Sequence, residues 1–561
     1  MSNTEQRKRH PSWKYHMFFH DDFVLGFFFF LGLLLYFLKN FYFPGRPPFA
    51  LDCPRTLARI SFSKTQTIGH VSFIRPHQVP TMNIGILGHV DSGKTTLAKA
   101  LSEMGSTAAF DKHAKVADLR ANTIDLGFSA LTINDSKIAL IDCPGHASLI
   151  KAVLAASSVF DAALVVINAA RGIEPQTAEH LLIASILCPK HVAVVLNKVD
   201  LVTPEKVKSM VTKIPKLLES LGIDKKSPIV PVSLATPDET AIGAVAEAVE
   251  QIFYLPERDT EGDFVMSVDH CFPIKGKGTV MTGTVVKGRC KVGMEVEIPI
   301  LNEKRKIKGI QSWKETISEA SMGQRAALLF QNLSEACTSI DRTVLYEPGA
   351  MESTHLLLGT IHHISQFKWT LKNRAKIHLS VGFETVMAEC QFLKEDGEEF
   401  ELQDAFEPAT TSRVLLELEK AVHTRPGAFF MAAKLDSTEK SCRFAFHGHI
   451  ERVLKSRTDE PRIFHRKQRA GVLDRIENDR SIICSQLFKK ETNFDVFNGM
   501  EVLLATGEVG RIEGSFGKGG KARIAIPGGL TGNLEAGKTE ILLKMKKYLN
   551  EGDKGKLVAY L

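Results

Sequence analysis

The segment with the clearest chemical signature is a glycine-rich loop that ends in Gly-Lys-Thr. It consists of Gly88, His89, Val90, Asp91, Ser92, Gly93, Lys94 and Thr95, and Thr96 follows it. The loop stands directly after an apolar run and directly before a helix-length segment, the setting in which this pattern binds phosphate. Backbone N–H groups of such a loop hold phosphate oxygens, and its lysine reaches the β- and γ-phosphates of a nucleoside triphosphate. We therefore expect Lys94 to contact the phosphates and Thr95 to bind Mg²⁺.

Two further motifs stand at the ends of apolar runs. The first is Asp142-Cys143-Pro144-Gly145, and the second is Asn197-Lys198-Val199-Asp200. Nucleotides bind at the carboxyl ends of parallel strands, so both motifs are expected beside the glycine-rich loop. The second motif can hydrogen-bond the guanine edge, because a carboxylate accepts from the two donors that guanine has and adenine lacks. The ordered set of motifs predicts GTP rather than ATP, with these residues around the nucleotide: Asp142, Gly145, Asn197, Lys198 and Asp200.

The residues from 82 to 254 must position these motifs, and here apolar strands alternate with helix-length segments. The expected strands are 83–88, 137–142, 162–168, 191–197 and 229–233, and the expected helices include 177–187 and 204–221. This alternation predicts a parallel sheet that is covered by helices on both faces.

From residue 260 onward the pattern shortens to strands that are rich in Val and Thr and separated by glycines. Such patterns are typical of closed antiparallel barrels. We expect a second domain at 260–349, a third at 350–445 with an acidic loop at 395–404, and a fourth at 446–561. The expected fold class is multidomain: an α/β P-loop GTPase domain followed by three β-barrel-type domains.

Composition narrows the choice of compartment and partner. The nine cysteines form no Cys-x-x-Cys pair, which favours a reducing compartment and excludes a structural zinc site of that type. The formal net charge is +7. Residues 441–561 contain about 22 Lys and Arg against about 15 Asp and Glu, so this region accounts for the excess. A solvated basic face and a polyanionic partner remain alternative interpretations.

The first 81 residues differ from everything that follows. The apolar run Phe23–Leu38 is preceded by a basic stretch and is about two residues short of a bilayer-crossing helix. One interpretation is a signal or anchor segment, which would attach the protein to a membrane. The other is a mis-assigned start, because Met82 directly precedes the first expected strand. We favour the second interpretation and expect a cytoplasmic protein, with membrane anchoring by 23–38 as the alternative.

The motifs and several further segments resemble a known family. The loop and the segment Asp142-Cys143-Pro144-Gly145-His146 are similar to translational GTPases of the elongation factor Tu type. More narrowly, the chain resembles eukaryotic selenocysteine-specific elongation factors, on Ser92 of the loop and on the segments STAAFDKH, TIDLGFS, MSVDHCFPIKGKGTVMTGTV, VGFETVM, FAFHG, LFKKETNF and IPGGL. This resemblance implies a monomeric, ribosome-stimulated GTPase that delivers selenocysteinyl-tRNA to the ribosome at UGA. The second and third domains would hold the acceptor arm, and the fourth would contact the selenocysteine insertion element RNA or its binding protein.

The resemblance also assigns roles in hydrolysis. Thr123 corresponds to the switch threonine that completes the Mg²⁺ shell, and His146 to the histidine that orients the attacking water, so that Lys94, Thr123 and His146 carry the reaction. Two departures from the family pattern stand out. Arg120-Ala121-Asn122 replaces Arg-Gly-Ile, which alters the backbone freedom of the switch loop. The expected Ser-Ala-Lys guanine loop reads Ser233-Leu234-Ala235, without the lysine.

The same resemblance places Asp269, His270 and Arg325 around the amino acid that is esterified to the tRNA. A selenol is a stronger acid than a thiol, so selenocysteine is an anion at neutral pH while serine is neutral. A permanent charge on Arg325 and a donor on His270 would favour the anion. The alternative is that Asp269 and Arg325 form a structural ion pair within the barrel.

Other functions fit parts of the pattern. One is another translational GTPase, either an elongation factor Tu paralogue or a protein like the gamma subunit of initiation factor two. A second is a non-enzymatic RNA-binding adaptor with a decayed GTPase domain, which the altered switch loop suggests. Ribosome-stimulated turnover of GTP would distinguish the adaptor from a factor.

Overall fold

The computed structural model describes residues 81–102, 126–133, 136–235, 239–274, 276–331, 333, 342–436, 441–517, 519–550 and 555–561. The apolar run 23–38 and the switch segment with Thr123 lie outside these residues. Among the described residues, no helix is both long and apolar enough to cross a membrane.

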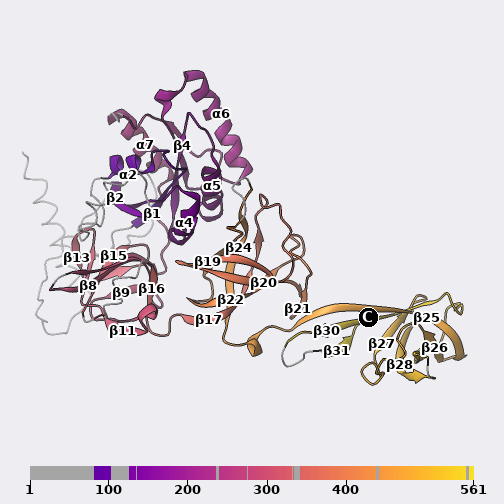
Figure 1. Ribbon diagram of the computed structural model, residues 1–561. Helices are drawn as coiled ribbons and strands as arrows, with labels where there is room; N and C mark the ends of the chain where they lie inside the picture. Colours follow the sequence, from indigo (N-terminus) through magenta and orange to yellow (C-terminus); the bar gives the residue numbers. More distant parts are fainter. Residues whose placement is uncertain are drawn as a thin grey trace, which may run out of the picture. The chain divides into compact units, whose positions relative to one another are not determined.

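A six-stranded sheet with the order β2-β3-β1-β4-β5-β6 forms the centre of the first domain (Figure 1). Its strands are β1 (Thr81–Leu87), β2 (Gly127–Ile133), β3 (Ser136–Asp142), β4 (Ala162–Asn168), β5 (Val192–Asn197) and β6 (Ile229–Pro231). All neighbouring pairs are parallel except β2 with β3. The predicted parallel sheet thus has an antiparallel edge strand. Met82 lies inside β1 and is fully buried, rather than preceding the strand.

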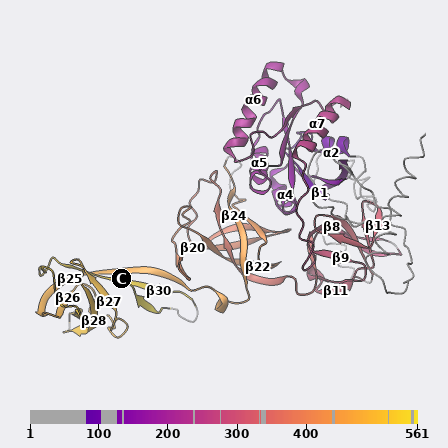
Figure 2. The same cartoon turned by 180° about the vertical axis from the view of Figure 1, so that it is seen from behind.

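Helices cover both faces of this sheet, as the alternating pattern predicted. They are α2 (Lys94–Leu101), α4 (Ile150–Ser157), α5 (Pro175–Leu187), α6 (Pro204–Ser220) and α7 (Glu239–Ile252). Residues of α4, α5 and α6 share one buried apolar cluster, and residues of α2 and α7 share another. Figure 2 shows α6 and α7 on opposite sides of the sheet. Successive residues of β4 enter opposite clusters, which explains why its sequence is apolar throughout.

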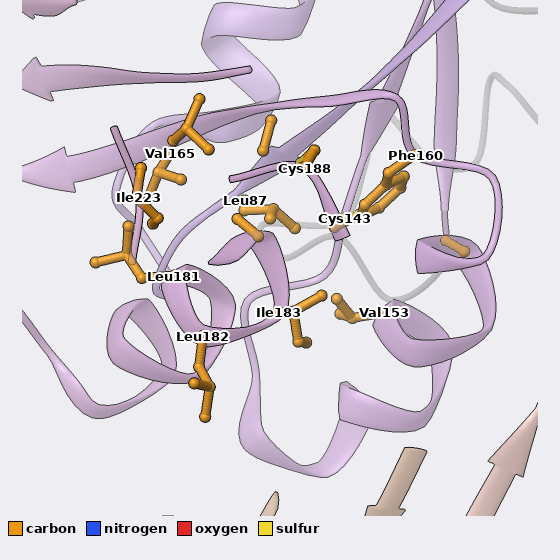
Figure 3. Packing of buried hydrophobic residues seen from close by; sticks show 14 of the residues in the cluster. Leu87, Cys143, Val153, Phe160, Val165, Leu181, Leu182, Ile183, Cys188 and Ile223 are labelled. Carbon is orange, nitrogen blue, oxygen red and sulfur yellow. The ribbon is translucent and has the colours of Figure 1, made fainter. Parts of the chain in front are cut away.

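The first of these clusters is the larger hydrophobic core of the domain. Figure 3 shows Leu181, Leu182 and Ile183 of α5 within it, together with Leu87 and Val165 of the sheet. Leu87 ends β1 immediately before the glycine-rich loop, so this core fixes the position from which the loop starts.

The second domain is an antiparallel sheet with the order β11-β10-β16-β7-β8-β15-β12-β13 around one apolar core. Its strands are β7 (Val265–Ile274), β8 (Gly278–Lys287), β10 (Glu295–Ile298), β11 (Glu303–Lys306), β12 (Gly309–Ser312), β13 (Glu315–Ile317), β15 (Arg325–Phe330) and β16 (Thr343–Tyr346). Strands β9 (Arg289–Lys291) and β14 (Glu319–Ser321) form a separate pair.

The third domain is a closed antiparallel barrel. Strands β19, β23, β24, β17, β22 and β20 pair in that order, and β20 pairs back to β19. The bounds are β17 (Glu352–Thr360), β18 (His362–His363), β19 (Ala375–Val381), β20 (Glu384–Asp396), β21 (Glu399–Leu402), β22 (Arg413–Thr424), β23 (Phe429–Ala433) and β24 (Phe444–Leu454). The boundary expected between 445 and 446 falls inside β24. This strand continues to Leu454 because it remains paired with β17 to that residue.

The fourth domain closes in the same way. Strands β25, β26, β29, β28, β27 and β30 pair in that order, and β30 pairs back to β25. The bounds are β25 (Ile463–Asn478), β26 (Ser481–Ser485), β27 (Glu501–Leu504), β28 (Val509–Phe516), β29 (Lys521–Ala525), β30 (Glu540–Tyr548) and β31 (Leu557–Ala559).

The acidic segment 395–404 is largely a hairpin rather than the loop that its charges suggested. It contains the end of β20 and all of β21, and β21 pairs in parallel with β25 of the fourth domain. Lys546 Nζ lies 2.7 Å from the carboxylate of Asp396, and Arg466 Nε lies 2.8 Å from that of Glu401. Asp396, Glu399 and Glu401 of this segment are therefore paired with basic residues of the next domain.

Candidate nucleotide-binding site

The glycine-rich loop has the backbone geometry that its glycines permit. Gly88 and Gly93 have φ angles of 141° and 105°, in the left-handed region that favours glycine. A Cβ atom on Gly93 would lie 2.1 Å from Asn197 Nδ2. The loop can therefore pass close to the guanine motif only with glycine at this position.

Lys94 begins α2, and its ammonium group turns back over the loop. Its Nζ donates to the backbone oxygen of His89 at 2.6 Å, and the residue is 5% exposed. Burial lowers the pKa of Lys94, although the nearby charge of Asp142 acts in the opposite direction. A buried ammonium that lacks full compensation favours the binding of an anion beside it.

The ends of α2 and β3 bring together two oxygen groups. Thr95 Oγ1 donates to Asp142 Oδ2 at 2.6 Å. Hydroxyl and carboxylate oxygens are the ligands that Mg²⁺ prefers, and Mg²⁺ in nucleotide sites takes only one or two of them from the protein. Thr95 and Asp142 therefore fit a magnesium ion that also binds phosphate. Thr123, the other expected Mg²⁺ ligand, lies outside the described residues.

Asn197 of the guanine motif connects three loops through hydrogen bonds. Asn197 is 2% exposed, and its Nδ2 donates to the backbone oxygen of Ser92 at 2.8 Å. Its Oδ1 accepts from the N–H groups of Lys198 at 2.7 Å and Leu234 at 3.0 Å. Asn197 thereby joins the loop after β1, the loop after β5 and the loop after β6. The Asn197 amide thus has a structural role in this arrangement.

Asp200 lies on the short 3-10 helix Val199–Leu201, and Ser233 holds its side chain. Its Oδ1 accepts from Ser233 Oγ at 2.6 Å, and the residue is exposed. The serine of the guanine loop thus orients the carboxylate. This contact does not use the lysine that the family pattern has at Ala235.

All three motifs contribute to one cavity of about 940 Å³. Predicted residues in its lining are Val90, Asp91, Gly93, Lys94, Thr95, Thr96, Gly145, His146, Asn197, Lys198, Asp200, Leu234 and Ala235. Ser92, Asp142 and Ser233 stand behind the lining and hydrogen-bond residues in it. Sequence reasoning missed Arg171, which also lines the cavity. Its place shortly after the end of β4, at the carboxyl edge of the sheet, was the signal that could have identified it.

His146 is an exposed residue at the rim of this cavity. Its Nδ1 accepts from the Ser148 N–H at 3.3 Å, so that His146 caps the 3-10 helix Ala147–Leu149. The same Nδ1 lies 2.8 Å from Ser148 Oγ. Because Nδ1 accepts this bond, Nε2 carries the proton of the neutral ring. The imidazole is thus oriented by its own loop.

Asp269, His270 and Arg325 meet in the second domain. Arg325 donates to both carboxylate oxygens of Asp269, at 2.6 and 2.9 Å, and both residues are buried. The guanidinium carbon also lies 3.2 Å from the ring centroid of Phe128. This is the ion-pair geometry of the structural alternative. Burial would raise the pKa of Asp269, but Arg325 and His270 outweigh it and hold that pKa below its ordinary value.

His270 is the member of this trio that reaches solvent, with 39% of its side chain exposed. Its Nδ1 lies 2.8 Å from Asp269 Oδ1, which is also the acceptor for Thr282 Oγ1 at 2.8 Å. An ionised carboxylate only accepts, so Nδ1 carries a proton and donates it to Asp269.

Comparison with known proteins identifies this architecture. Residues 79–258 match the elongation factor Tu GTP binding domain. Residues 358–402 match the third domain of the eukaryotic selenocysteine-specific elongation factor, and 460–557 match the eEFSec C-terminal RIFT domain. A solved structure, translation elongation factor SelB from Methanococcus maripaludis with the GTP analogue GppNHp, is similar with a TM-score of 0.65 and 30% identity, covering 83% of this chain and 98% of that one.

Curated relatives agree with the structural match. The selenocysteine-specific elongation factor of Methanocaldococcus jannaschii is 31% identical over 379 residues, covering 66% of this chain and 80% of that protein. That of Mus musculus is 34% identical over 521 residues, covering 80% of this chain and 89% of the mouse protein. The chain therefore belongs to the family of selenocysteine-specific elongation factors, which are translational GTPases.

Proposed function

We propose that this chain binds GTP with Mg²⁺, carries selenocysteinyl-tRNA to the ribosome, and hydrolyses GTP there during selenocysteine incorporation at UGA. The observation that carries the proposal is the single cavity lined by all three nucleotide motifs, in a chain similar to the mouse factor over 80% of its length. We infer that the protein acts as a monomer in the cytoplasm, where the ribosome is.

The nucleotide would lie across the carboxyl edge of the sheet. Lys94 and the N–H groups of the glycine-rich loop would bind the β- and γ-phosphates, and Asp200 would accept from the guanine edge. Thr95 and Asp142, with Thr123 from the switch loop, would hold Mg²⁺ directly or through water. When bound, this ion neutralises charge that develops on the phosphates.

Hydrolysis would depend on positioning rather than on covalent catalysis. His146 would orient the attacking water once the ribosome brings its imidazole over the cavity. Its side chain is exposed, and among the described residues its hydrogen bonds go to Ser148 of its own loop, so reorientation would break weak contacts. The motion of a single exposed histidine fits a GTPase that is slow until it is stimulated.

Selection of the amino acid would depend on the second domain. With both terminal nitrogens of the buried Arg325 guanidinium paired to Asp269, the donor to the selenolate would be His270, whose side chain reaches solvent. Serine has no charge and would not be favoured in this way. Arg325 would act indirectly, by holding Asp269 and hence the orientation of His270.

This assignment is tested with His270→Ala in the full chain. We expect the affinity for selenocysteinyl-tRNA to fall toward that for seryl-tRNA while the melting temperature stays near wild type. His362→Ala, at an exposed position on β18 of the third domain, is the matched control and should keep the preference. If His270→Ala keeps the full preference for selenocysteinyl-tRNA over seryl-tRNA, the assignment is wrong and specificity must come from the body of the tRNA.

The fourth domain would contact the selenocysteine insertion element RNA or the protein bound to it. Its match to the eEFSec C-terminal RIFT domain and the basic excess of residues 441–561 support this assignment. A truncation after Leu454 keeps β24 intact and tests it. GTP and tRNA binding should remain while UGA recoding is lost, and retained recoding would contradict the assignment.

A further inference from the structure

Helix α5 contacts the glycine-rich loop through a buried histidine that the nucleotide motifs do not include. His180 Nδ1 accepts from the backbone N–H of Gly88 at 2.8 Å, and the residue is 1% exposed. Burial, with a contribution from Lys94, lowers the pKa of His180 to about 3. The ring is therefore neutral at physiological pH, and its Nδ1 keeps the lone pair that the Gly88 N–H requires.

A second contact joins the start of the same helix to the next loop residue. Glu174 precedes α5, and its carboxylate lies 3.4 Å from His89 Nε2. The backbone oxygen of His89 in turn accepts from Lys94 Nζ. Contacts from α5 and from the residue before it thus hold both Gly88 and His89. The position of Lys94 depends on His89, because the His89 backbone oxygen accepts from Lys94 Nζ.

The residue before His180 contacts a different domain. Glu179 forms a bidentate ion pair with Arg443, with both N···O distances at 2.7 Å. The Arg443 and Glu179 side chains are only 7% and 11% exposed. Consecutive helical residues point about 100° apart, so His180 can face the loop while Glu179 faces the third domain. Charge-assisted bidentate pairs of this kind fix relative orientation as well as distance.

Apolar packing reinforces the ion pair. Phe444, which follows Arg443 and begins β24, is fully buried and belongs to the same core cluster as Leu181 and Leu182 of α5. Figure 3 shows the α5 side of this cluster. The third domain and the sheet of the first domain are therefore both packed against α5. Interiors of this density transmit small shifts of one element to its neighbours.

We propose that α5 couples the third domain to the phosphate site, with His180 as a positioning residue for the glycine-rich loop. A displacement of the third domain pulls on Glu179, shifts α5, and changes the hydrogen bond that His180 makes to Gly88. Nucleotide affinity then depends on the state of a domain that does not touch the nucleotide. The coupling rests on GTP binding alone and holds whether or not the amino-acid specificity proposed above is correct.

The first test removes the acceptor. His180→Leu leaves the buried Gly88 N–H without a partner and is expected to weaken GDP binding about tenfold. His180→Asn can place an amide oxygen near the position of Nδ1 and should recover most of the affinity. Equal losses in the two variants would show that the histidine only fills space.

The second test measures the coupling with fluorescent GDP on the full chain. Arg443→Met removes the charge and keeps most of the bulk, and it should accelerate GDP dissociation by about two- to thirtyfold, the range of mutations that modulate coupling. Arg413→Met removes an Arg–Glu pair within the third domain, to Glu451, and should leave dissociation unchanged. If Arg443→Met does not fold, Glu179→Gln serves in its place.

The double variant His180→Leu/Arg443→Met tests whether the Glu179–Arg443 ion pair acts through His180. If the ion pair acts through His180, Arg443→Met should add no further effect in the His180→Leu background. Two effects that multiply independently, or a dissociation rate unchanged by Arg443→Met alone, would overturn the proposal.

Discussion

Asp200→Asn should change the base that the protein recognises without disturbing the site around it. In the structure, Ser233 Oγ donates to Asp200 Oδ1 at 2.6 Å, and the amide oxygen of asparagine can accept the same bond. The side-chain amide of Asn197, which joins the three loops, makes its hydrogen bonds to the backbone of Ser92, Lys198 and Leu234 and not to Asp200. The side chain should therefore keep its place, and only its hydrogen-bonding character should change.

The size of the effect follows from the number of bonds lost. A carboxylate accepts from both the N1–H and the exocyclic amine of guanine, and each hydrogen bond to a charged group contributes about 1.5–3 kcal/mol. Losing both costs about 3–6 kcal/mol, or a 10²- to 10⁴-fold rise in the Kd for GTP. Xanthine has an exocyclic oxygen in place of the amine, so the asparagine amide can donate to it and restore the pair.

Competition of GTP, inosine triphosphate and xanthosine triphosphate against fluorescent GDP measures this change. Wild-type protein should lose about 1.5–3 kcal/mol with inosine, which lacks the amine and so forms one bond fewer. Ser233→Ala is the control for orientation and should weaken all guanine nucleotides without favouring xanthine. Unchanged GTP affinity in Asp200→Asn, or no gain for xanthosine triphosphate, would refute the assignment of Asp200 to the base.

Three further outcomes are expected. His146→Ala should leave the Kd for GTP within about twofold and lower ribosome-stimulated single-turnover hydrolysis by at least about tenfold, because orienting water matters only in the transition state; equal hydrolysis would remove its role. Lys94→Ala should abolish measurable GTP binding in the same fluorescence assay, and retained binding would contradict the phosphate assignment. Hydrogen bonds from Thr506, Gly532 and Thr531 lower the pKa of Glu508 to about 2. Protection of the Gly532 amide from hydrogen exchange, corrected for intrinsic rates, should therefore persist above pH 4.5 and fall as the pH drops toward 2, while Glu508→Gln lacks this dependence.

The nucleotide site could be predicted from the sequence because its parts are local. A glycine-rich loop between a strand and a helix has few alternative conformations, and the order of the three motifs along the chain determines which strand ends meet. Asp200 and Lys94 therefore line the cavity where they were expected. Strand β2 was missed as an element because its seven residues follow the switch segment without a distinct period.

Contacts between distant parts of the chain could not be predicted in this way. His180 lies in an apolar stretch where a packed histidine and a positioning histidine look the same, and its partner Gly88 is 92 residues away. The acidic segment 395–404 suggested a solvated loop, since its counter-charges on Arg466 and Lys546 belong to another domain. The end of the third domain was misplaced because the exposed His449 and Glu451 of β24 do not mark an apolar strand.

The most direct test of the central claim compares two aminoacyl-tRNAs on one tRNA body. Selenocysteinyl-tRNA and seryl-tRNA are mixed with the full chain in the presence of GTP or GDP, and the affinity is measured by protection of the ester bond from hydrolysis. We expect tight binding of the selenocysteinyl form with GTP, at least about tenfold weaker binding of the seryl form, and loss of protection with GDP. Equal protection of both amino acids, or protection that does not depend on the nucleotide, would contradict the claim.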